Sequence, residues 1–346
     1  MSNKVAIICD THFGVRKGSQ IFHDYFEKFY SETFFPELKR RGINTIIHLG
    51  DCFDVRKTID YWSLDWSKRV FFNPAREMGI QIHLIVGNHD SAYKNTLAIN
   101  SPELNLAEYD NIHIYSKPTT VSINNRVSFM VPWICDGNAE DFKTELDTTD
   151  ATVVFGHLEL AGFYANKDYQ CDHGTDPDIF SKFDRVFSGH FHKKSSKGNT
   201  TYLGNPYQIY WNDEGEERGF HIFDLETLDL EFIKNPTEMF HKIYYDETKK
   251  KLFNPNKYKD SYIKVIVEGK STPLRLSRFI DSLYDVGVHD IKVIENYEAE
   301  VEEGVTIESE DTLTTLTNYV NALSDSPNKE NVINIFKSLY VEAQEV

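Results

Sequence analysis

The chain has 346 residues, of which 40% are apolar and 26% charged, and its net charge is −17. This length exceeds that of most single domains, so we expect one large domain with one or two smaller appendages. The negative charge argues against a free-standing nucleic-acid-binding protein, whose surface would be basic. The sequence contains no run of transmembrane length, and its four cysteines show no paired spacing, so we expect reduced thiols in a cytoplasm.

The first part of the chain alternates short β-branched runs with helical stretches, which is typical of an α/β sheet. Strands are predicted at residues 5–9, 44–49 and 81–86, and helices at residues 20–40 and 61–78 lie between them.

Shorter strands follow, and the last four of them are expected to continue a second sheet. These strands are predicted at residues 111–115, 121–123, 127–131, 151–155, 185–187, 200–203 and 220–223. The pattern predicts an α/β (α+β) fold in which two mixed β-sheets pack face to face and are flanked by helices.

The charge changes sign after this region. Residues 1–240 carry 24 Lys and Arg against 35 Asp and Glu, whereas residues 241–294 carry 11 against 7. A small β-α-β unit is predicted in this basic segment, with strands at 262–267 and 290–294 and a helix at 274–285. The predicted domains are therefore residues 1–239, a basic unit at 240–296, an acidic linker at 297–311 and a helical pair at 312–346.

Potential metal ligands follow directly on the predicted strands of the first 200 residues. The carboxyl ends of strands in such sheets converge on one crevice, so we expect these side chains to meet. They comprise two carboxylates, four imidazoles and one amide: Asp10, His12, Asp51, Asn88, His157, His190 and His192.

This set of nitrogen and oxygen ligands suits Mn²⁺, and also Mg²⁺, Fe²⁺ or Zn²⁺, because it has no thiolate that would select zinc. One carboxylate can bridge two ions roughly 3.5–4 Å apart, and such a pair holds the attacking and leaving oxygens of a phosphoryl group. A single Asp-x-His or Gly-x-His is a weak signal, but five such groups in order predict a two-metal phosphoesterase.

The motifs resemble those of the calcineurin-like metallophosphoesterases over residues 5–205. Finer features are similar to the SbcD branch of the meiotic-recombination-eleven family of double-strand-break nucleases, especially the nuclease subunits of T-even phages. These features are GDCFDVR at 50–56, GNHD at 87–90, GHLEL at 156–160, GHFH at 189–192 and YLGNP at 202–206.

The resemblance implies a division of the ligands between two ions. One ion would be held by Asp10, His12, Asp51 and His192, and the other by Asp51, Asn88, His157 and His190. It further implies that His89 donates a proton or hydrogen bond to the leaving oxygen, with Asp90 orienting it. Some members of the family carry a second histidine three residues after the bridging carboxylate, where this chain has Asp54. Arg56 is expected to contact a substrate phosphate or to form a salt bridge with Asp54.

The family also implies a substrate and a partner. Its members cleave DNA as exonucleases on double-stranded ends and endonucleases on single strands, in recombination and break repair, as homodimers within a heterotetramer with an SbcC-like coiled-coil ATPase. The basic unit resembles the family's DNA-capping domain, and the helical pair is expected to bind the ATPase. The DNA backbone would contact lysines of the basic unit, unless these form only a solvated surface: Lys249, Lys250, Lys251 and Lys264.

Two other functions compete with a nuclease. Protein phosphatases of the same superfamily carry Gly-Asp-x-x-Asp-Arg-Gly and Gly-Asn-His-Glu, whereas this chain has Val55 between Asp54 and Arg56 and has Asp90 in place of the Glu. A small-molecule phosphatase would not need the basic unit or the tail. A scaffold that has lost activity would lack a ligand, and none is missing. His48 and His83 within strands, and His173 in a loop, are predicted not to be ligands.

Overall fold

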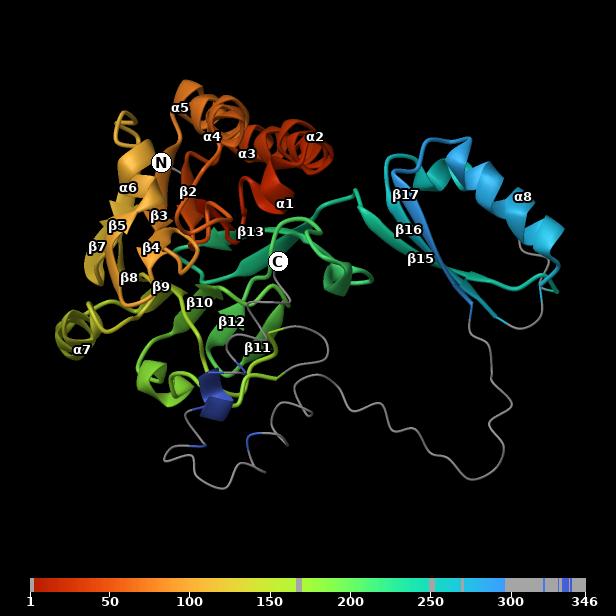
Figure 1. The fold of residues 1–346 in the computed structure, drawn as a ribbon. Coiled ribbons are helices and arrows are strands. Elements are labelled where there is room, and N and C mark those ends of the chain that lie inside the picture. The colour runs from red at the N-terminus through yellow and green to blue at the C-terminus, as the bar shows by residue number, and fades with distance from the viewer. Residues whose placement is uncertain are drawn as a thin grey trace. The chain divides into compact units, whose positions relative to one another are not determined.

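The computed structural model describes residues 3–165, 170–248, 253–268 and 271–295, together with residues 320, 329, 332–335 and 337. The chain divides into two compact units, Met1–Met239 and Phe240–Val346 (Figure 1). The predicted linker and most of the predicted helical pair lie outside the described residues, as do Lys249, Lys250 and Lys251. Among the helices that are described, none has the length and apolar character needed to cross a membrane.

The first sheet of unit 1 is mixed and contains the amino-terminal strand at its centre. Its order is β14 (Leu230–Lys234), β13 (Gly219–Asp224), β1 (Lys4–Ile8), β2 (Thr45–His48), β3 (Gln81–Ile85) and β6 (Ile112–Tyr115). The strands from β1 to β6 are parallel, and β13 is antiparallel to β1.

The prediction that residues 220–223 belong to the second sheet is wrong, because Phe223 in β13 pairs with Val5 in β1. The first five residues of β13 are buried, as expected for a strand covered on both faces. Such a run indicates a strand but does not specify its neighbour, which here lies more than 200 residues away along the chain.

The second sheet runs through strands from the middle of the chain. Its order is β11 (Ser195–Lys197), β12 (Thr200–Tyr202), β10 (Arg185–Gly189), β9 (Val153–His157), β8 (Arg126–Val131) and β7 (Thr119–Ile123). Asn124 and Asn125 join β7 to β8 with φ angles of 47° and 69°, as a two-residue type I′ hairpin turn requires.

The main core lies between the two sheets. It contains Val5, Ile7, Ile47, Leu49 and Ile85 from the first sheet and Met130, Val153, Phe155 and Phe187 from the second. The predicted face-to-face packing of two mixed sheets is therefore confirmed, and it fixes the strand ends of both sheets against each other.

Two long helical segments cover the outer side of the first sheet (Figure 1). Each was predicted as one helix, but each contains a π-helical turn, at Tyr30–Phe34 and Lys68–Phe72. A proline follows each π-turn, Pro36 and Pro74, and proline has no N–H to donate within the helix. The helical pieces are α2 (Gln20–Phe29), α3 (Phe35–Arg41), α4 (Tyr61–Ser67) and α5 (Asn73–Glu77).

Smaller elements complete unit 1. On the second sheet, α7 (Ala139–Thr148) packs through Phe142 against Phe129 of β8. Further short elements are α1 (Val15–Gly18), β4 (Ser91–Tyr93), β5 (Thr96–Asn100) and α6 (Ser101–Asn105), and neither these nor α7 were predicted from the sequence.

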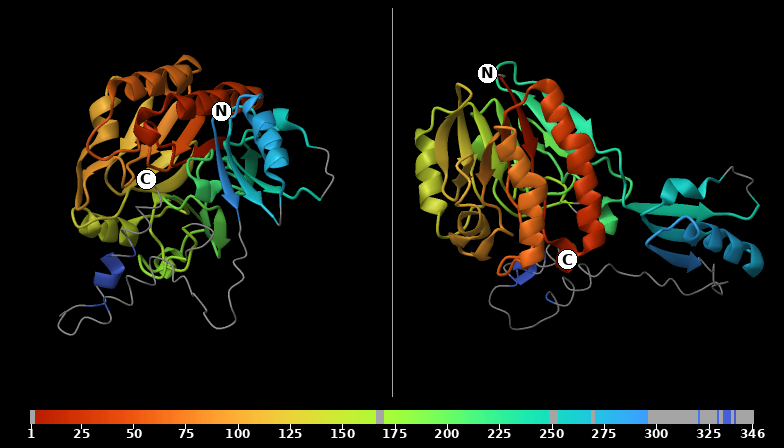
Figure 2. Two further views of the ribbon diagram at one scale, coloured as in Figure 1. Left: turned by 45° about the vertical axis from the view of Figure 1, so that its right-hand side comes forward. Right: turned by 90° about the horizontal axis from the view of Figure 1, so that it is seen from above.

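Unit 2 contains a three-stranded parallel sheet with one helix along one face (Figure 1, Figure 2). The elements β16 (Tyr262–Val267), α8 (Pro273–Tyr284) and β17 (Asp290–Glu295) correspond to the predicted β-α-β unit, and β15 (Phe240–Tyr245) adds a strand that was not predicted. Side chains from strands and helix form its core: Ile243, Ile263, Val265, Val267, Leu276, Leu283 and Val288.

Candidate metal centre

Loops at the carboxyl ends of β1, β2, β3, β9 and β10 bring the seven predicted ligands together in unit 1. Their side chains form two groups whose potential ligand atoms lie within 4.8 Å of one another: Asp10, His12 and His192 in the first, and Asp51, His157 and His190 in the second. Asn88 lies in the second group, and all seven residues are buried. Burial of so many polar side chains in one place indicates a common ligand, because buried polar groups otherwise destabilise the fold.

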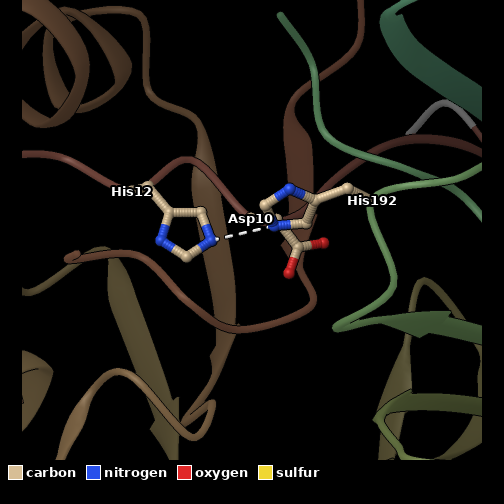
Figure 3. Close-up of side chains that lie close together, drawn as sticks. All are labelled: Asp10, His12 and His192. Atoms are coloured by element: carbon tan, nitrogen blue, oxygen red, sulfur yellow. Dashed lines mark hydrogen bonds between the residues drawn. The ribbon is translucent and has the colours of Figure 1, made fainter. Parts of the chain in front are cut away.

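In the first group, the imidazoles of His12 and His192 face each other, as Figure 3 shows. Their Nε2 atoms are 3.2 Å apart. Asp10 accepts a hydrogen bond from the backbone N–H of His190 at Oδ1, at 2.9 Å, while its buried Oδ2 has no hydrogen-bond partner. Burial raises the pKa of Asp10 and lowers the pKa of His192, whose proximity to His12 lowers it further. A cation would satisfy both imidazole nitrogens and the second carboxylate oxygen.

In the second group, two side-chain oxygens and two imidazole nitrogens meet. Asn88 Oδ1 lies 2.8 Å from His157 Nε2 and 3.1 Å from His190 Nδ1, and Asp51 Oδ2 lies 3.2 Å from His157 Nε2. His157 donates its Nδ1–H to the carbonyl oxygen of Leu49 at 2.7 Å, so Nε2 is the ring nitrogen that would bind a cation. Without a cation the Asn88 amide would be better satisfied in the reverse orientation, with its oxygen toward Arg56.

A divalent cation explains the observed orientation. Ligands bound at about 2.1 Å and at right angles are about 3.0 Å from one another, which matches the distances around Asn88 Oδ1. The residues of both groups therefore fit divalent metal ions, and the hydrogen bond from His157 to Leu49 is of the kind that fixes the tautomer of a metal-binding histidine.

Asp51 interacts electrostatically with both groups. Its Oδ1 accepts a hydrogen bond from the backbone N–H of His89 at 2.8 Å, and its Oδ2 faces His157. Burial opposes ionisation of this carboxyl, but His157, His89 and His12 outweigh burial and hold its pKa well below the usual range. Burial in turn lowers the pKa of His157, and the neighbouring Asp51 carboxylate raises it by more, to about 9. Asp51 is thus an ionised carboxylate in contact with the histidines of the site.

Four of the ligand residues have a left-handed backbone. The φ angles are 52° for Asp10, 44° for His12, 51° for Asp51 and 81° for His190. This conformation is costly for residues other than glycine and persists where surrounding contacts enforce it, most often at functional sites. Here the neighbouring loops enforce it, because Asp10 donates its N–H to Gly50 and His12 donates its N–H to Asp51. A side chain at Gly50 would approach His157 Nδ1 to 2.6 Å.

The two residues with predicted catalytic roles occupy different environments. His89 is half-buried, and its Nδ1 lies 2.6 Å from the carbonyl oxygen of Asp54, to which it donates. The Asp90 carboxylate instead accepts from the backbone N–H groups of Cys52, Phe53 and Gly87, at 2.9–3.0 Å. Asp90 thus holds the loops after β2 and β3 together, and the main-chain carbonyl of Asp54 is a hydrogen-bond partner of the His89 ring.

Asp54 also contacts the first ligand group. Its Oδ1 lies 3.1 Å from His12 Nδ1. Burial lowers the pKa of His12, and the Asp54 carboxylate raises it by more. Arg56 also lies at the site, where its Nη2 is 3.2 Å from the side-chain amide of Asn88.

Several residues beside the site were not identified from the sequence. Glu159 Oε1 lies 3.8 Å from His190 Nε2 and 3.6 Å from the ring of His173, which was predicted to be a solvated loop residue. The Trp133 ring lies 4.9 Å from that of His190. Trp133 follows strand β8 in the same way that the metal ligands follow other strands. This position in the sequence could have indicated that Trp133 lies at the site. Behind His192, the buried Arg218 donates to the carbonyl oxygen of His192 and pairs with Asp213 at 2.9 Å.

His48 belongs to neither of the two ligand groups. It is buried, its Nδ1 accepts from the backbone N–H of Gly50, and its Nε2 lies 3.0 Å from Thr11 Oγ1. Burial lowers its pKa to about 3, so the ring stays neutral and links the loops after β1 and β2.

Comparisons with known proteins identify the family. The family described as calcineurin-like phosphoesterase matches residues 3–194. The chain is 35% identical over 311 residues to exonuclease subunit 1 of Enterobacteria phage T4, covering 88% of this chain and 89% of the phage protein. The likeness to T-even phage proteins expected from the motifs is therefore confirmed.

Two solved structures are more distant. An archaeal phosphodiesterase covers 67% of this chain and 99% of its own length, with 12% identity and a TM-score of 0.35. A dimetal phosphatase from Danio rerio covers 63% and 91%, with 12% identity and a TM-score of 0.39. Scores this low have no bearing on the substrate. The family match and the phage relative, in contrast, identify the family. This chain belongs to the calcineurin-like phosphoesterases, hydrolases that use divalent metal ions.

Proposed function

We propose that this protein is a metal-dependent DNA nuclease, an exonuclease on double-stranded ends and an endonuclease on single strands. The observation that carries the proposal is the meeting of two potential ligand groups near Asp51, which together would form a centre for phosphodiester hydrolysis. The likeness to a phage exonuclease subunit over 88% of the chain favours DNA over the phosphorylated proteins or small molecules of other family members.

The two groups would hold two ions, with Mn²⁺ the expected metal. Asp51 would serve both ions, and the others would divide as their positions suggest: Asp10, His12 and His192 for one, and Asn88, His157 and His190 for the other. Bound ions supply Lewis-acid stabilisation of the phosphoryl oxygens and make water a better nucleophile at neutral pH. The protein contributes their fixed positions, because each aspartate uses one oxygen on a backbone N–H and directs the other into the site.

His89 would transfer the proton to the leaving oxygen. Its Nδ1–H is held by the Asp54 carbonyl oxygen, so the imidazolium carries its second proton on Nε2. Its ring lies 5.0 Å from that of His12, at the edge of the first ligand group, and is half-buried rather than enclosed. A histidine in this position assists the departure of an alkoxide, which in DNA is a sugar oxygen.

Unit 2 would bind the DNA backbone. Lys242, Lys264 and Lys292 lie side by side in register across β15, β16 and β17. The buried Ile263 and Val265 on either side of Lys264 belong to the core beneath α8, so the lysines alternate onto the opposite face of the sheet. Like charges in adjacent strands repel one another, and a polyanion would offset that repulsion.

We further propose that the chain is the nuclease subunit of an assembly with an SbcC-like coiled-coil ATPase, in which two copies form a homodimer within a heterotetramer. The phage relative is named as a subunit, which supports an assembly. The contact with the ATPase is assigned to residues 312–346, where apolar residues recur at helical spacing. Recombination and break repair in the cytoplasm, that of the host if a phage encodes the chain, are the processes that such a complex would serve.

A comparison of substrates tests the proposal. The full chain with Mn²⁺ is incubated with linear duplex DNA, a single-stranded oligonucleotide, bis-p-nitrophenyl phosphate and the monoester p-nitrophenyl phosphate. A nuclease cleaves both DNAs and the diester, and loses these activities when the metal is chelated. Hydrolysis of the monoester alone would instead establish a phosphatase.

A further inference from the structure

The turn that follows His12 has an unusual backbone. Arg16 and Lys17 have φ angles of 55° and 58°, and Gly18 continues the left-handed run at 70°. Two consecutive non-glycine residues rarely adopt this conformation, because each Cβ approaches a carbonyl oxygen. Strain of this kind persists only where surrounding contacts hold it, and it is frequent where a side chain must be presented in one direction.

His23 of α2 holds both ends of this turn. Its Nε2 accepts from the backbone N–H of Gly14 at 3.3 Å, and its Nδ1 donates to the carbonyl oxygen of Ser19 at 2.8 Å. Burial lowers the pKa of His23, in agreement with a neutral ring that accepts at one nitrogen and donates at the other. Val15 is buried beneath the turn, while Arg16 and Lys17 are exposed. The fold therefore fixes the turn and leaves its two cations in solvent.

The ring of Tyr210 links Arg16 to the first ligand group. The guanidinium of Arg16 lies 5.0 Å from the centre of the Tyr210 ring. The Tyr210 ring is stacked in turn against the imidazole of His192, with centroids 6.0 Å apart and planes 10° apart. A nucleic-acid strand that passes the Tyr210 ring on its way to His192 would therefore meet the positive charge of Arg16.

Neither cation is neutralised within the part of the chain that the structure describes. No carboxylate there lies within salt-bridge distance of Arg16 or Lys17, although the net charge of the chain is −17. Some other cations of unit 1 do have such partners: Arg40 pairs with Glu37, Lys68 with Glu108 and Lys193 with Glu216. Two adjacent charges kept apart from acids in an acidic protein favour an anionic ligand.

We propose that Arg16 and Lys17 bind the phosphates of the DNA strand that flank the phosphodiester being cleaved, so that the turn guides the strand past His192. This assignment rests on the proposed nuclease function and adds a substrate-binding site to it. The guanidinium suits the task because it binds phosphate oxygens through two parallel N–H donors, and the lysine adds a second point charge.

The test measures how KM for a single-stranded oligonucleotide depends on salt in the full chain with Mn²⁺. Arg16→Asn and Lys17→Asn each remove one charge, and asparagine tolerates the left-handed backbone. Each lost phosphate contact should reduce the slope of log KM against log salt by about 0.7. Arg16→Lys, which keeps the charge, should retain most of the slope. Lys143→Gln, on the exposed surface of α7, is the matched control and should leave the slope unchanged.

The outcomes separate this proposal from the nuclease function itself. Both Asn variants should also lower the ratio of kcat/KM for DNA to kcat/KM for bis-p-nitrophenyl phosphate, because the small diester has no flanking phosphates. A fall in kcat on both substrates with an unchanged salt slope would mean that Arg16 only supports Tyr210, and would overturn the proposal. A wild-type protein that cleaves the diester but no DNA would refute the nuclease function.

Discussion

Replacing Asp54 by alanine removes one hydrogen-bond acceptor and keeps another. The carboxylate that lies 3.1 Å from His12 Nδ1 is lost, whereas the main-chain carbonyl that accepts from His89 Nδ1 remains. Because His12 belongs to the Asp10–His12–His192 group, we expect the variant to weaken the binding of one metal ion and to leave the proton transfer assigned to His89 intact.

The size of the effect follows from the geometry. His12 is fully buried and the Asp54 side chain is 15% exposed, so their contact is largely protected from solvent. A charge-assisted hydrogen bond of this kind contributes about 1.5–3 kcal/mol, and losing it from a metal-binding histidine lowers metal affinity roughly 10–100-fold. Asp54→Asn keeps a neutral acceptor of about half that strength, so its loss should be about 3–10-fold.

Calorimetric titration of the full chain with Mn²⁺, beside hydrolysis of bis-p-nitrophenyl phosphate at rising Mn²⁺ concentrations, measures both quantities. We expect affinity at one site to fall in the order Asp, Asn, Ala, and turnover to recover when the metal is saturating. An alanine variant that binds both ions as tightly as the wild type would refute the reasoning, as would a loss of turnover that saturating metal does not restore.

Three further predictions concern single residues. Asp51→Asn should abolish metal-dependent hydrolysis of the diester while changing the thermal transition little, because its loop adds little to the core; wild-type turnover would exclude a bridging role. His89→Ala should lose about 10²–10⁴ in kcat and still bind both ions in a Mn²⁺ titration; loss of an ion would make His89 a ligand. Burial lowers the pKa of His221 to about 3, whereas the unfolded chain binds this proton near pH 6.5, so stability falls as pH drops from 6.5 toward 3. Between pH 7 and pH 5, urea denaturation of His221→Gln should therefore show a loss about 2 kcal/mol smaller than that of the wild type, and equal losses would contradict the assignment.

The metal ligands were predictable from the sequence because each lies near the end of a predicted strand. Each of them comes just after a run of apolar residues, and strand ends in a layered α/β fold meet at one edge. Asp10 and His190 are about 180 residues apart in the chain, yet the backbone N–H of His190 donates to Asp10. Residue type and order were sufficient to predict that such groups converge.

Contacts that depend on three-dimensional pairing were not predictable in the same way. The contacts of Asp90 depend on which backbone N–H groups lie within reach of its carboxylate, and no periodicity encodes that. The left-handed turn at Arg16 depends on His23, whose sequence pattern is that of an ordinary helical residue. The placement of β13 beside β1 likewise required the whole fold, because strand propensity is local and pairing is not.

The central claim is that the strand ends of unit 1 form a two-ion centre, and the number of ions bound measures it directly. Equilibrium dialysis of the full chain against Mn²⁺, followed by elemental analysis, gives the stoichiometry. We predict two ions per chain, falling to one in Asn88→Ala, because Asn88 contacts His157 and His190 of the Asp51–His157–His190 group. A stoichiometry of one or none in the wild-type protein at saturating Mn²⁺ would contradict this account of the site.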